Sequence, residues 1–208
     1  MRIGVISDTH IPDKCEHIPA AVLDVFKHVD MVIHAGDIVS LKVIEELRSA
    51  CSRVEAVAGN MDRSDVVKKY PVKQVFNISG VKIGLTHGSG APVNLIELLK
   101  DTFKTDNCDI IIFGHSHKPM NERIGKVLFF NPGSATDFLS GDTSYGIIDI
   151  DERLERRGLP LDKQSHRTER RGLPLDRQSH RLEGRGLPSD RQSHRIDGDG
   201  IKANIVKI

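Results

Sequence analysis

The sequence predicts an α/β fold. Five short apolar runs have the length and composition of buried β-strands, and segments with helical periodicity lie between several of them. This alternation is typical of a largely parallel sheet covered by helices. From about Val72 onward the pattern changes to pairs of strands joined by turns such as Ser79-Gly80, which predicts a second sheet packed on the first.

The individual elements are expected to be short. Strands are predicted over residues 2–7, 31–36, 54–59, 81–86 and 109–114. A helix is expected between Pro19 and Val29, where valines and Phe26 recur on one face. Ser40 is a suitable N-cap for a second helix, and Pro92 is a suitable first residue for a third.

Composition excludes several classes of protein. The chain has 208 residues, and its 30 Lys and Arg against 29 Asp and Glu give a formal net charge of +1. The longest apolar runs are about six residues, too short for a membrane span or a signal peptide. Three widely spaced cysteines (Cys15, Cys51 and Cys108) form no zinc-binding spacing and suit a reducing compartment. We therefore expect a cytoplasmic protein.

Residues 153–195 form a basic tandem repeat with a period of fourteen residues. They contain 12 Lys and Arg against 6 Asp and Glu, whereas the remainder of the chain is acidic. Each copy has a central Gly and Pro and ends in Gln-Ser-His, and leucine is its only large apolar residue. Burial of so little apolar surface cannot offset the conformational entropy lost on ordering. The repeat is therefore predicted to be a mostly disordered insertion.

The segments on either side of the repeat place it inside one domain. Residues 144–151 and 196–208 both have strand character, and Asp197-Gly198-Asp199-Gly200 is a hairpin turn signal. Long insertions in exposed turns cost little free energy. We expect a single domain over residues 1–208 that the segment 153–195 interrupts in a hairpin turn.

Each of the five predicted strands is followed by side chains that bind divalent metals. In chain order these are Asp8, His10, Asp37, Asn60, His87, His115 and His117. Ligand sites in open α/β folds lie beyond the carboxyl ends of the strands, so these side chains should converge. Carboxylate, amide and imidazole groups suit manganese, iron, nickel or zinc. Seven are too many for one ion and suit two ions that share a carboxylate.

The same motifs carry a family resemblance. The ordered set Asp8-x-His10, Gly36-Asp37, Gly59-Asn60-x-Asp62, His87 and Gly114-His115-Ser116-His117 resembles the calcineurin-like metallophosphoesterase superfamily. The short chain, its Gly-Asn-x-Asp motif and Asn131-Pro132-Gly133-Ser134 are most similar to the small YfcE-like phosphodiesterase subgroup. The resemblance covers residues 1–151 and 196–208. It implies a four-layer α/β/β/α sandwich of two mixed β-sheets flanked by helices.

The resemblance also implies the metal ligands. One ion would be held by Asp8, His10, Asp37 and His117, and the other by Asp37, Asn60, His87 and His115, with Asp37 as the bridge. A metal-bound hydroxide would attack phosphorus in line with the leaving oxygen, and Asp37, Asn60 and His87 would position the hydroxide and the phosphate. Manganese is the ion we expect first, with nickel, iron, zinc and magnesium as alternatives.

Two residues next to Asn60 affect the expected chemistry. Met61 stands where many superfamily phosphatases have a histidine, and methionine cannot transfer a proton to a leaving group. Activated aryl phosphodiesters should therefore be better substrates than alkyl monoesters. Asp62 is a candidate outer partner of a ligand histidine, and a solvated turn residue or helix cap is an equal alternative. His34 is interpreted as a hydrogen-bonded core histidine, and residues 131–134 as a structural turn near the site.

The function expected is therefore a metal-dependent phosphoesterase, in the first place a phosphodiesterase. The alternative is a non-catalytic protein-interaction scaffold on the same fold, which Met61 favours; a nuclease ranks lower because the acidic part of the chain has no obvious basic stripe. We expect a small phosphoester substrate and neither a membrane nor a nucleic acid as partner, with a homodimer or a higher homo-oligomer left open. Deletion of 153–194 should leave activity intact.

Overall fold

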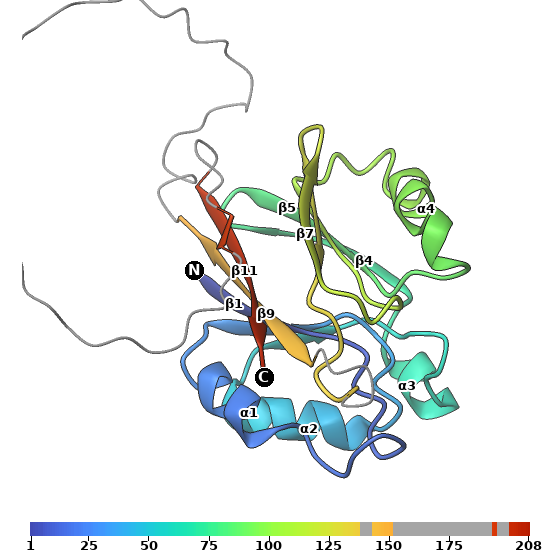
Figure 1. Ribbon diagram of the computed structural model, residues 1–208, viewed down its shortest axis with the longest axis vertical. Helices are drawn as coiled ribbons and strands as arrows, with labels where there is room; N and C mark the ends of the chain where they lie inside the picture. The colour runs from blue at the N-terminus through green and yellow to red at the C-terminus, as the bar shows by residue number, and fades with distance from the viewer. Residues whose placement is uncertain (138–142, 152–192, 195–199) are drawn as a thin grey trace, which may run out of the picture.

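A computed structural model describes residues 1–137, 143–151, 193–194 and 200–208. Two β-sheets lie face to face, α1 (Ala20–Phe26) and α2 (Leu41–Ala50) cover one outer surface, and α4 (Leu95–Thr102) covers the other (Figure 1). The predicted four-layer α/β/β/α arrangement is confirmed.

The first sheet has six strands. They are β1 (Arg2–Ile6), β2 (Met31–His34), β3 (Val54–Ala56), β9 (Ser144–Ile150), β10 (Ser193–His194) and β11 (Ile201–Lys207). Their order is β10-β11-β9-β1-β2-β3. Pairing is parallel from β1 to β3 and antiparallel from β1 through β9 and β11 to β10, so the sheet is mixed.

The second sheet has five strands. They are β4 (Lys73–Ile78), β5 (Val81–Thr86), β6 (Ile110–Ile112), β7 (Met120–Ile124) and β8 (Val127–Asn131). Their order is β4-β5-β6-β8-β7, with parallel pairing only among β5, β6 and β8. The five predicted apolar runs are therefore divided between two mixed sheets: β1, β2 and β3 lie in one, and β5 and β6 in the other.

α1 and α2 begin where the sequence signals predict, whereas α4 begins at Leu95, three residues after Pro92. The Ser40 hydroxyl accepts a hydrogen bond from the Lys42 N–H (3.4 Å) and caps α2. α1 ends at Phe26, earlier than predicted, because the Asp30 N–H already bonds the Arg2 carbonyl as the chain enters β2. A 3-10 turn (Pro92–Asn94) precedes α4, and the short α3 (Ser64–Lys69) follows β3.

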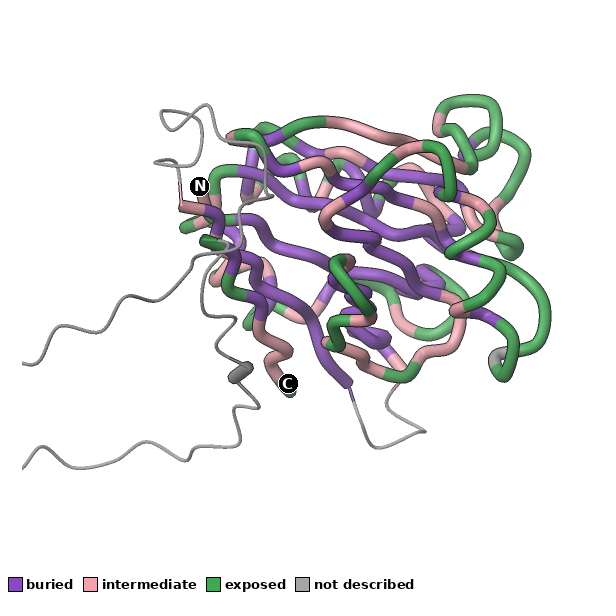
Figure 2. Tube along the Cα trace, turned by 90° about the horizontal axis from the view of Figure 1, so that it is seen from above, coloured by how far each residue is buried: buried purple, intermediate pink, exposed green. Residues whose placement is uncertain are grey.

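Three apolar layers hold the sandwich together. The central one lies between the sheets and includes Ile3, Ile33, Ile83, Ile110 and Phe130, all fully buried. A second packs the first sheet against α1 and α2, and a third packs the second sheet against α4. β1 after Arg2, β2 and β6 consist of buried residues, so they read as continuous apolar runs in the sequence. Figure 2 shows the buried residues gathered in the interior of the sandwich.

Four strands end one to three residues before the predicted position. β1 ends at Ile6, β2 at His34, β3 at Ala56 and β6 at Ile112. In each case the chain leaves the sheet just before the predicted metal ligands. Residues Asp8, Asp37 and His115, which follow three of these strands, have positive φ, a conformation that cannot continue a strand.

β9 and β11 form the predicted hairpin around the repeat. They pair along their whole length, from Ser144 opposite Lys207 to Ile150 opposite Ile201, and the Asp151 N–H bonds the Gly200 carbonyl (2.8 Å). The prediction of disorder falls on residues outside the described part of the chain. At the end of the repeat, β10 pairs with β11.

No helix in the described residues is long and apolar enough to span a membrane. The three cysteines are free thiols.

The pairing of β9 with β11 predicts that the domain folds without the repeat. Replacing residues 152–199 by Asn-Gly would join Asp151 to Gly200 through a two-residue turn, which suits an antiparallel pair. Loop closure becomes less costly, which offsets the loss of β10. We expect the melting temperature to be equal to that of the intact chain or higher, as measured by circular dichroism. A decrease of more than about 5 °C, equivalent to roughly 1–2 kcal/mol, would show that the inserted segment stabilises the fold.

Candidate metal centre

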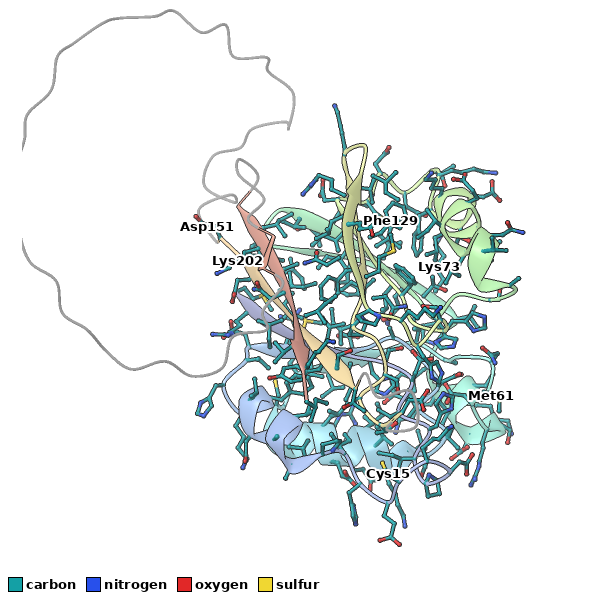
Figure 3. The ribbon with its side chains drawn as sticks, viewed as in Figure 1. Cys15, Met61, Lys73, Phe129, Asp151 and Lys202 are labelled. Atoms are coloured by element: carbon teal, nitrogen blue, oxygen red, sulfur yellow. The ribbon has the colours of Figure 1, made fainter. Side chains whose placement is uncertain are left out.

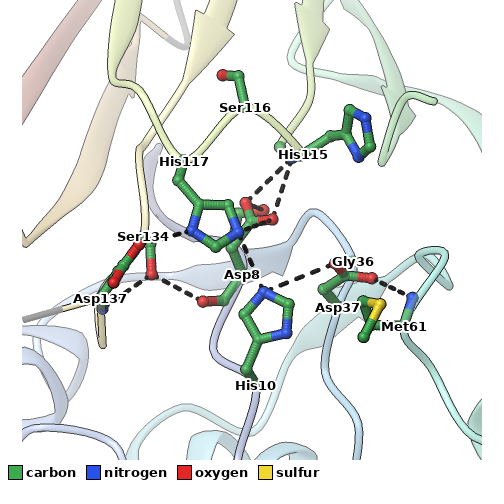
Figure 4. Close-up of polar contacts among 12 residues, drawn as sticks. Asp8, His10, Gly36, Asp37, Met61, His115, Ser116, His117, Ser134 and Asp137 are labelled. Atoms are coloured by element: carbon green, nitrogen blue, oxygen red, sulfur yellow. Dashed lines mark hydrogen bonds and ion pairs between the residues drawn. The ribbon is translucent and has the colours of Figure 1, made fainter. Parts of the chain in front are cut away.

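The ends of five strands meet at one end of the sandwich. The segment after β1 is joined to the segment after β2 by hydrogen bonds from Asp8 N–H to Gly36 O and from His10 N–H to Asp37 O, both 3.0 Å. In the second sheet, the Gly114 N–H bonds the His87 carbonyl (3.1 Å). The two sets of loops face each other across a cluster of carboxylates and imidazoles (Figure 4). The convergence predicted from the strand ends is therefore observed.

One group of potential metal ligands consists of Asp8, His10 and His117. His117 Nε2 lies 3.1 Å from His10 Nε2 and 3.4 Å from Asp8 Oδ1. The other nitrogen of His117, Nδ1, lies 3.0 Å from Asp137 Oδ2, so the imidazole N–H donates to that carboxylate. This hydrogen bond leaves the Nε2 lone pair facing His10 and Asp8.

A second group consists of Asp8, Asp37 and His87, all buried. His87 Nδ1 donates to the Ala35 carbonyl (2.8 Å), so Nε2 carries the lone pair of the neutral ring. Nε2 lies 3.2 Å from Asp37 Oδ2 and 3.8 Å from Asp8 Oδ1, yet it has no hydrogen-bond partner among the described residues. A buried lone pair directed at two carboxylates fits a divalent cation.

Asn60 and His115 lie beside the second group but are paired with each other. Asn60 Oδ1 is 3.0 Å from His115 Nδ1, and the Gly90 carbonyl is 2.8 Å from His115 Nε2. Both oxygens are acceptors, so a neutral ring donates to only one of them. The His115 ring meets the His87 ring edge-on, with 5.3 Å between their centroids. Five of the seven predicted ligands thus form the two groups, and the other two lie at their margin.

Burial and charge oppose each other in the two carboxylates. Burial raises the pKa of Asp8, against the lowering effect of His87. Burial also acts to raise the pKa of Asp37, but its contacts with His87 and the Met61 N–H lower that pKa overall. Burial lowers the pKa of His10, whereas Asp37 and Asp8 outweigh burial and raise the pKa of His87. The carboxylate of Asp37 is therefore the one whose negative charge its surroundings favour.

The ligand residues are held in a costly backbone conformation. Asp8, His10, Asp37, His115 and His117 all have φ between 45° and 69°, the left-handed region that non-glycine residues rarely adopt. Each such residue costs on the order of 1 kcal/mol and persists only where the surroundings fix it. Concentration of this strain on the predicted ligands is typical of a functional site.

Glycines before the ligands permit the close approach of the loops. A methyl group on Gly114 would collide with Ser7 Oγ and the Asp8 carboxylate, and one on Gly59 would collide with Asp37. These contacts explain why the motifs read Gly-His and Gly-Asn rather than a larger residue followed by the ligand.

Several neighbouring residues hold the loops rather than face the ligand groups. Asp62 accepts hydrogen bonds from the Gly59 N–H (2.7 Å) and the Val39 N–H, so it joins the loops after β2 and β3. Asn131 donates to the Gly114 carbonyl (2.8 Å) and Ser134 to the Asp8 carbonyl (2.8 Å). The expected structural turn at 131–134 is confirmed.

His34 is the hydrogen-bonded core histidine that the sequence predicts. Its Nδ1 accepts from the Gly36 N–H (3.2 Å), so Nε2 donates to Thr9 Oγ1 (3.0 Å). Burial, with the nearby His87, lowers the pKa of His34 to about 3, and the ring is therefore neutral at pH 7.

Met61 and Asp137 lie at the margin of the site, and only Met61 was singled out from the sequence. Met61 is 56% exposed near α3 (Figure 3), and its N–H donates to Asp37 Oδ1 (2.8 Å). Asp137, the partner of His117, was not among the sequence-based candidates. The available signal was an acidic residue three positions after Ser134, in a segment already expected to lie near the site.

Comparisons with known proteins identify the family to which the chain is related. The calcineurin-like phosphoesterase superfamily domain matches residues 1–153. A probable metallophosphoesterase of Methanothermobacter thermautotrophicus is 38% identical over 166 residues, which cover 77% of this chain and 95% of that protein. A phosphodiesterase of Methanocaldococcus jannaschii is 31% identical, with 74% of this chain and 95% of that protein covered.

Among solved structures, Vps29 of Entamoeba histolytica is 29% identical to this chain. The TM-score is 0.64 for its D62A variant and 0.63 for the wild-type protein in complex with zinc. Each alignment covers 73% of this chain and 87% of that one. The motifs, the fold and these matches show that the chain belongs to the calcineurin-like phosphoesterase superfamily.

Proposed function

We propose that the protein is a phosphodiesterase that uses two divalent metal ions. The observation that carries this proposal is the buried Nε2 of His87, which faces both Asp8 and Asp37 and has no hydrogen-bond partner in the part of the chain that the structure describes. Beside it, two further imidazole nitrogens face the same carboxylates: His10 Nε2 faces Asp37, and His117 Nε2 faces Asp8. Two ligand groups joined by shared carboxylates suit the two-ion arrangement of phosphate-ester hydrolases.

The positions of the carboxylate oxygens support a bridging role for Asp37. Its Oδ2 lies 3.6 Å from His10 Nε2 and 3.2 Å from His87 Nε2, so it faces both groups. Its Oδ1 is held by the Met61 N–H, which fixes the orientation of the carboxylate. Asp8 Oδ1 likewise faces both His117 and His87. One ion would be held by Asp8, His10, Asp37 and His117, and the other by Asp37, His87, Asn60 and His115.

Bound divalent ions would supply positive charge for the phosphate and lower the pKa of water. Asn60 and His115 lie at the exposed side of the site, where they can complete the ligand set of the second ion once their mutual contact opens. The Met61 side chain stands at the same margin and offers no proton to a leaving oxygen. Esters whose leaving group departs as a stable anion are therefore the preferred substrates. Manganese is the ion proposed first, with nickel, iron, zinc and magnesium as alternatives.

The first prediction concerns the bridging carboxylate. Metal-stripped protein supplied with manganese, nickel, magnesium or zinc should hydrolyse bis-p-nitrophenyl phosphate, and Asp37→Asn should reduce kcat/KM by more than about 100-fold, the upper end of what loss of an outer partner costs. The amide keeps the shape of the side chain but loses the charge that binds the ions. The matched control is Asp13→Asn, an exposed carboxylate paired with Arg63 (3.4 Å), which should retain full activity.

Melting curves of the intact protein and of Asp37→Asn, both without metal, show whether the variant loses activity because it no longer folds. Metal-dependent turnover that survives in Asp37→Asn would contradict the proposed bridge. Metal binding by the intact protein without turnover of any ester would instead favour a non-catalytic interaction scaffold. The match to Vps29, named as a vacuolar protein sorting protein, makes this the second candidate function.

The second prediction concerns proton supply to the leaving group. Met61→His should raise kcat for an alkyl phosphate by at least about 10-fold, because general acids contribute roughly 10²- to 10⁴-fold when well placed. Turnover of bis-p-nitrophenyl phosphate should change less, since p-nitrophenolate needs no proton. Met61→Leu is the control for side-chain size, and the exposure of this position makes both substitutions tolerable. An unchanged ratio of alkyl to aryl turnover would show that Met61 does not limit leaving-group protonation.

A further inference from the structure

Asp137 contacts the ring nitrogen of His117 that points away from the ligand cluster. Its Oδ2 lies 3.0 Å from His117 Nδ1. A carboxylate oxygen accepts hydrogen bonds, so Nδ1 carries the proton and Nε2 carries the lone pair. The Nε2 atom is the one that faces His10 at 3.1 Å and Asp8 at 3.4 Å. Asp137 therefore selects the tautomer of His117 that can bind a cation within the cluster.

The position of Asp137 is fixed through Asp8. The Ser134 hydroxyl donates to the Asp8 carbonyl (2.8 Å) and accepts from the Asp137 N–H (3.1 Å). The Thr136 hydroxyl donates to the Thr9 carbonyl (2.7 Å). The segment that carries Asp137 is thus attached to the segment that carries Asp8. The Asp137 carboxylate contacts Nδ1 of His117, and the Asp8 carboxylate faces Nε2 of the same ring (Figure 4).

The two ligand groups differ in how their histidines are supported. His87 Nδ1 donates to a neutral carbonyl, that of Ala35, whereas His117 Nδ1 donates to a carboxylate. A carboxylate partner increases the basicity of an imidazole ligand and orients its ring more strongly than a neutral acceptor does. The group of Asp8, His10 and His117 therefore has an additional source of affinity that the group of Asp37 and His87 does not share.

We propose that Asp137 is a positioning residue of the metal centre, which orients His117 and selectively strengthens binding of the ion held by Asp8, His10 and His117. This inference rests on the proposed metal-dependent function. Asp137 thus contributes affinity to the ion on the side of His117 alone.

The test measures metal binding rather than turnover. Metal-stripped protein is titrated with manganese and with zinc by isothermal titration calorimetry. Asp137→Asn and Asp137→Ala should weaken one of the two binding events by about 10- to 100-fold, more in the alanine variant, and leave the other within about 2-fold. Lys14→Met is the matched control, because the Lys14 ammonium is 4.0 Å from the other oxygen of Asp137 and should not contribute.

A second measurement reports on the proposed cause. Nitrogen-15 NMR of the His117 ring in the metal-free protein should show the Nδ1–H tautomer in the wild type and a mixture with Nε2–H in Asp137→Ala. Unchanged metal affinities would overturn the proposal, and so would an unchanged tautomer or equal weakening of both ions. Circular dichroism spectra and melting curves of the variants identify any general loss of folding, and the asparagine variant preserves the side-chain size.

The two proposals can fail separately. An active enzyme whose two metal affinities do not respond to Asp137 substitutions would refute the positioning role alone. A protein that binds two ions, responds to Asp137 as predicted and hydrolyses no phosphate ester would refute the catalytic function alone.

Discussion

The carboxylate of Asp8 is the point at which both sheets are joined. It is fully buried and accepts hydrogen bonds from the Ser7 hydroxyl (2.6 Å) and from the His115 N–H (3.1 Å), which follows β6 in the opposite sheet. The backbone carbonyl of Asp8 accepts a hydrogen bond from the Ser134 hydroxyl, and the backbone N–H of Asp8 donates to the Gly36 carbonyl. A buried carboxylate is costly unless it is neutralised or fully hydrogen-bonded. This requirement fixes the loops around it.

The cost of that arrangement is distributed over the loops. Residues such as His10 and His117 adopt left-handed backbone conformations, and Gly59 and Gly114 remain without a side chain so that the loops can touch. The hydrophobic layers between and outside the sheets supply the stability that allows this strain. A rigid scaffold and a strained set of ligands are thus two parts of one design, in which packing far from the site maintains its geometry.

Much of this could be predicted from the sequence because the relevant signals are local. Strands buried on both faces give apolar runs, and the ligands follow them directly, so the convergence of Asp8, Asp37 and His87 was predictable. The change of pattern at about Val72 predicted a second sheet, but βαβ alternation does not specify which strands pair within each sheet. The link from Asp137 to His117 depends on a tertiary contact across twenty residues. The pairing of Asn60 with His115, and the attachment of Asp62 to two backbone N–H groups, are also invisible in spacing alone.

The central claim is that these carboxylates and imidazoles form one centre for two ions. Anomalous X-ray diffraction from manganese-soaked crystals tests it directly. The account predicts two manganese peaks about 3.5–4 Å apart. One should be in contact with Asp8, His10 and His117, and the other with Asp37 and His87. Absence of manganese from this cluster, or a single ion with His87 Nε2 unligated at saturating manganese, would contradict the account.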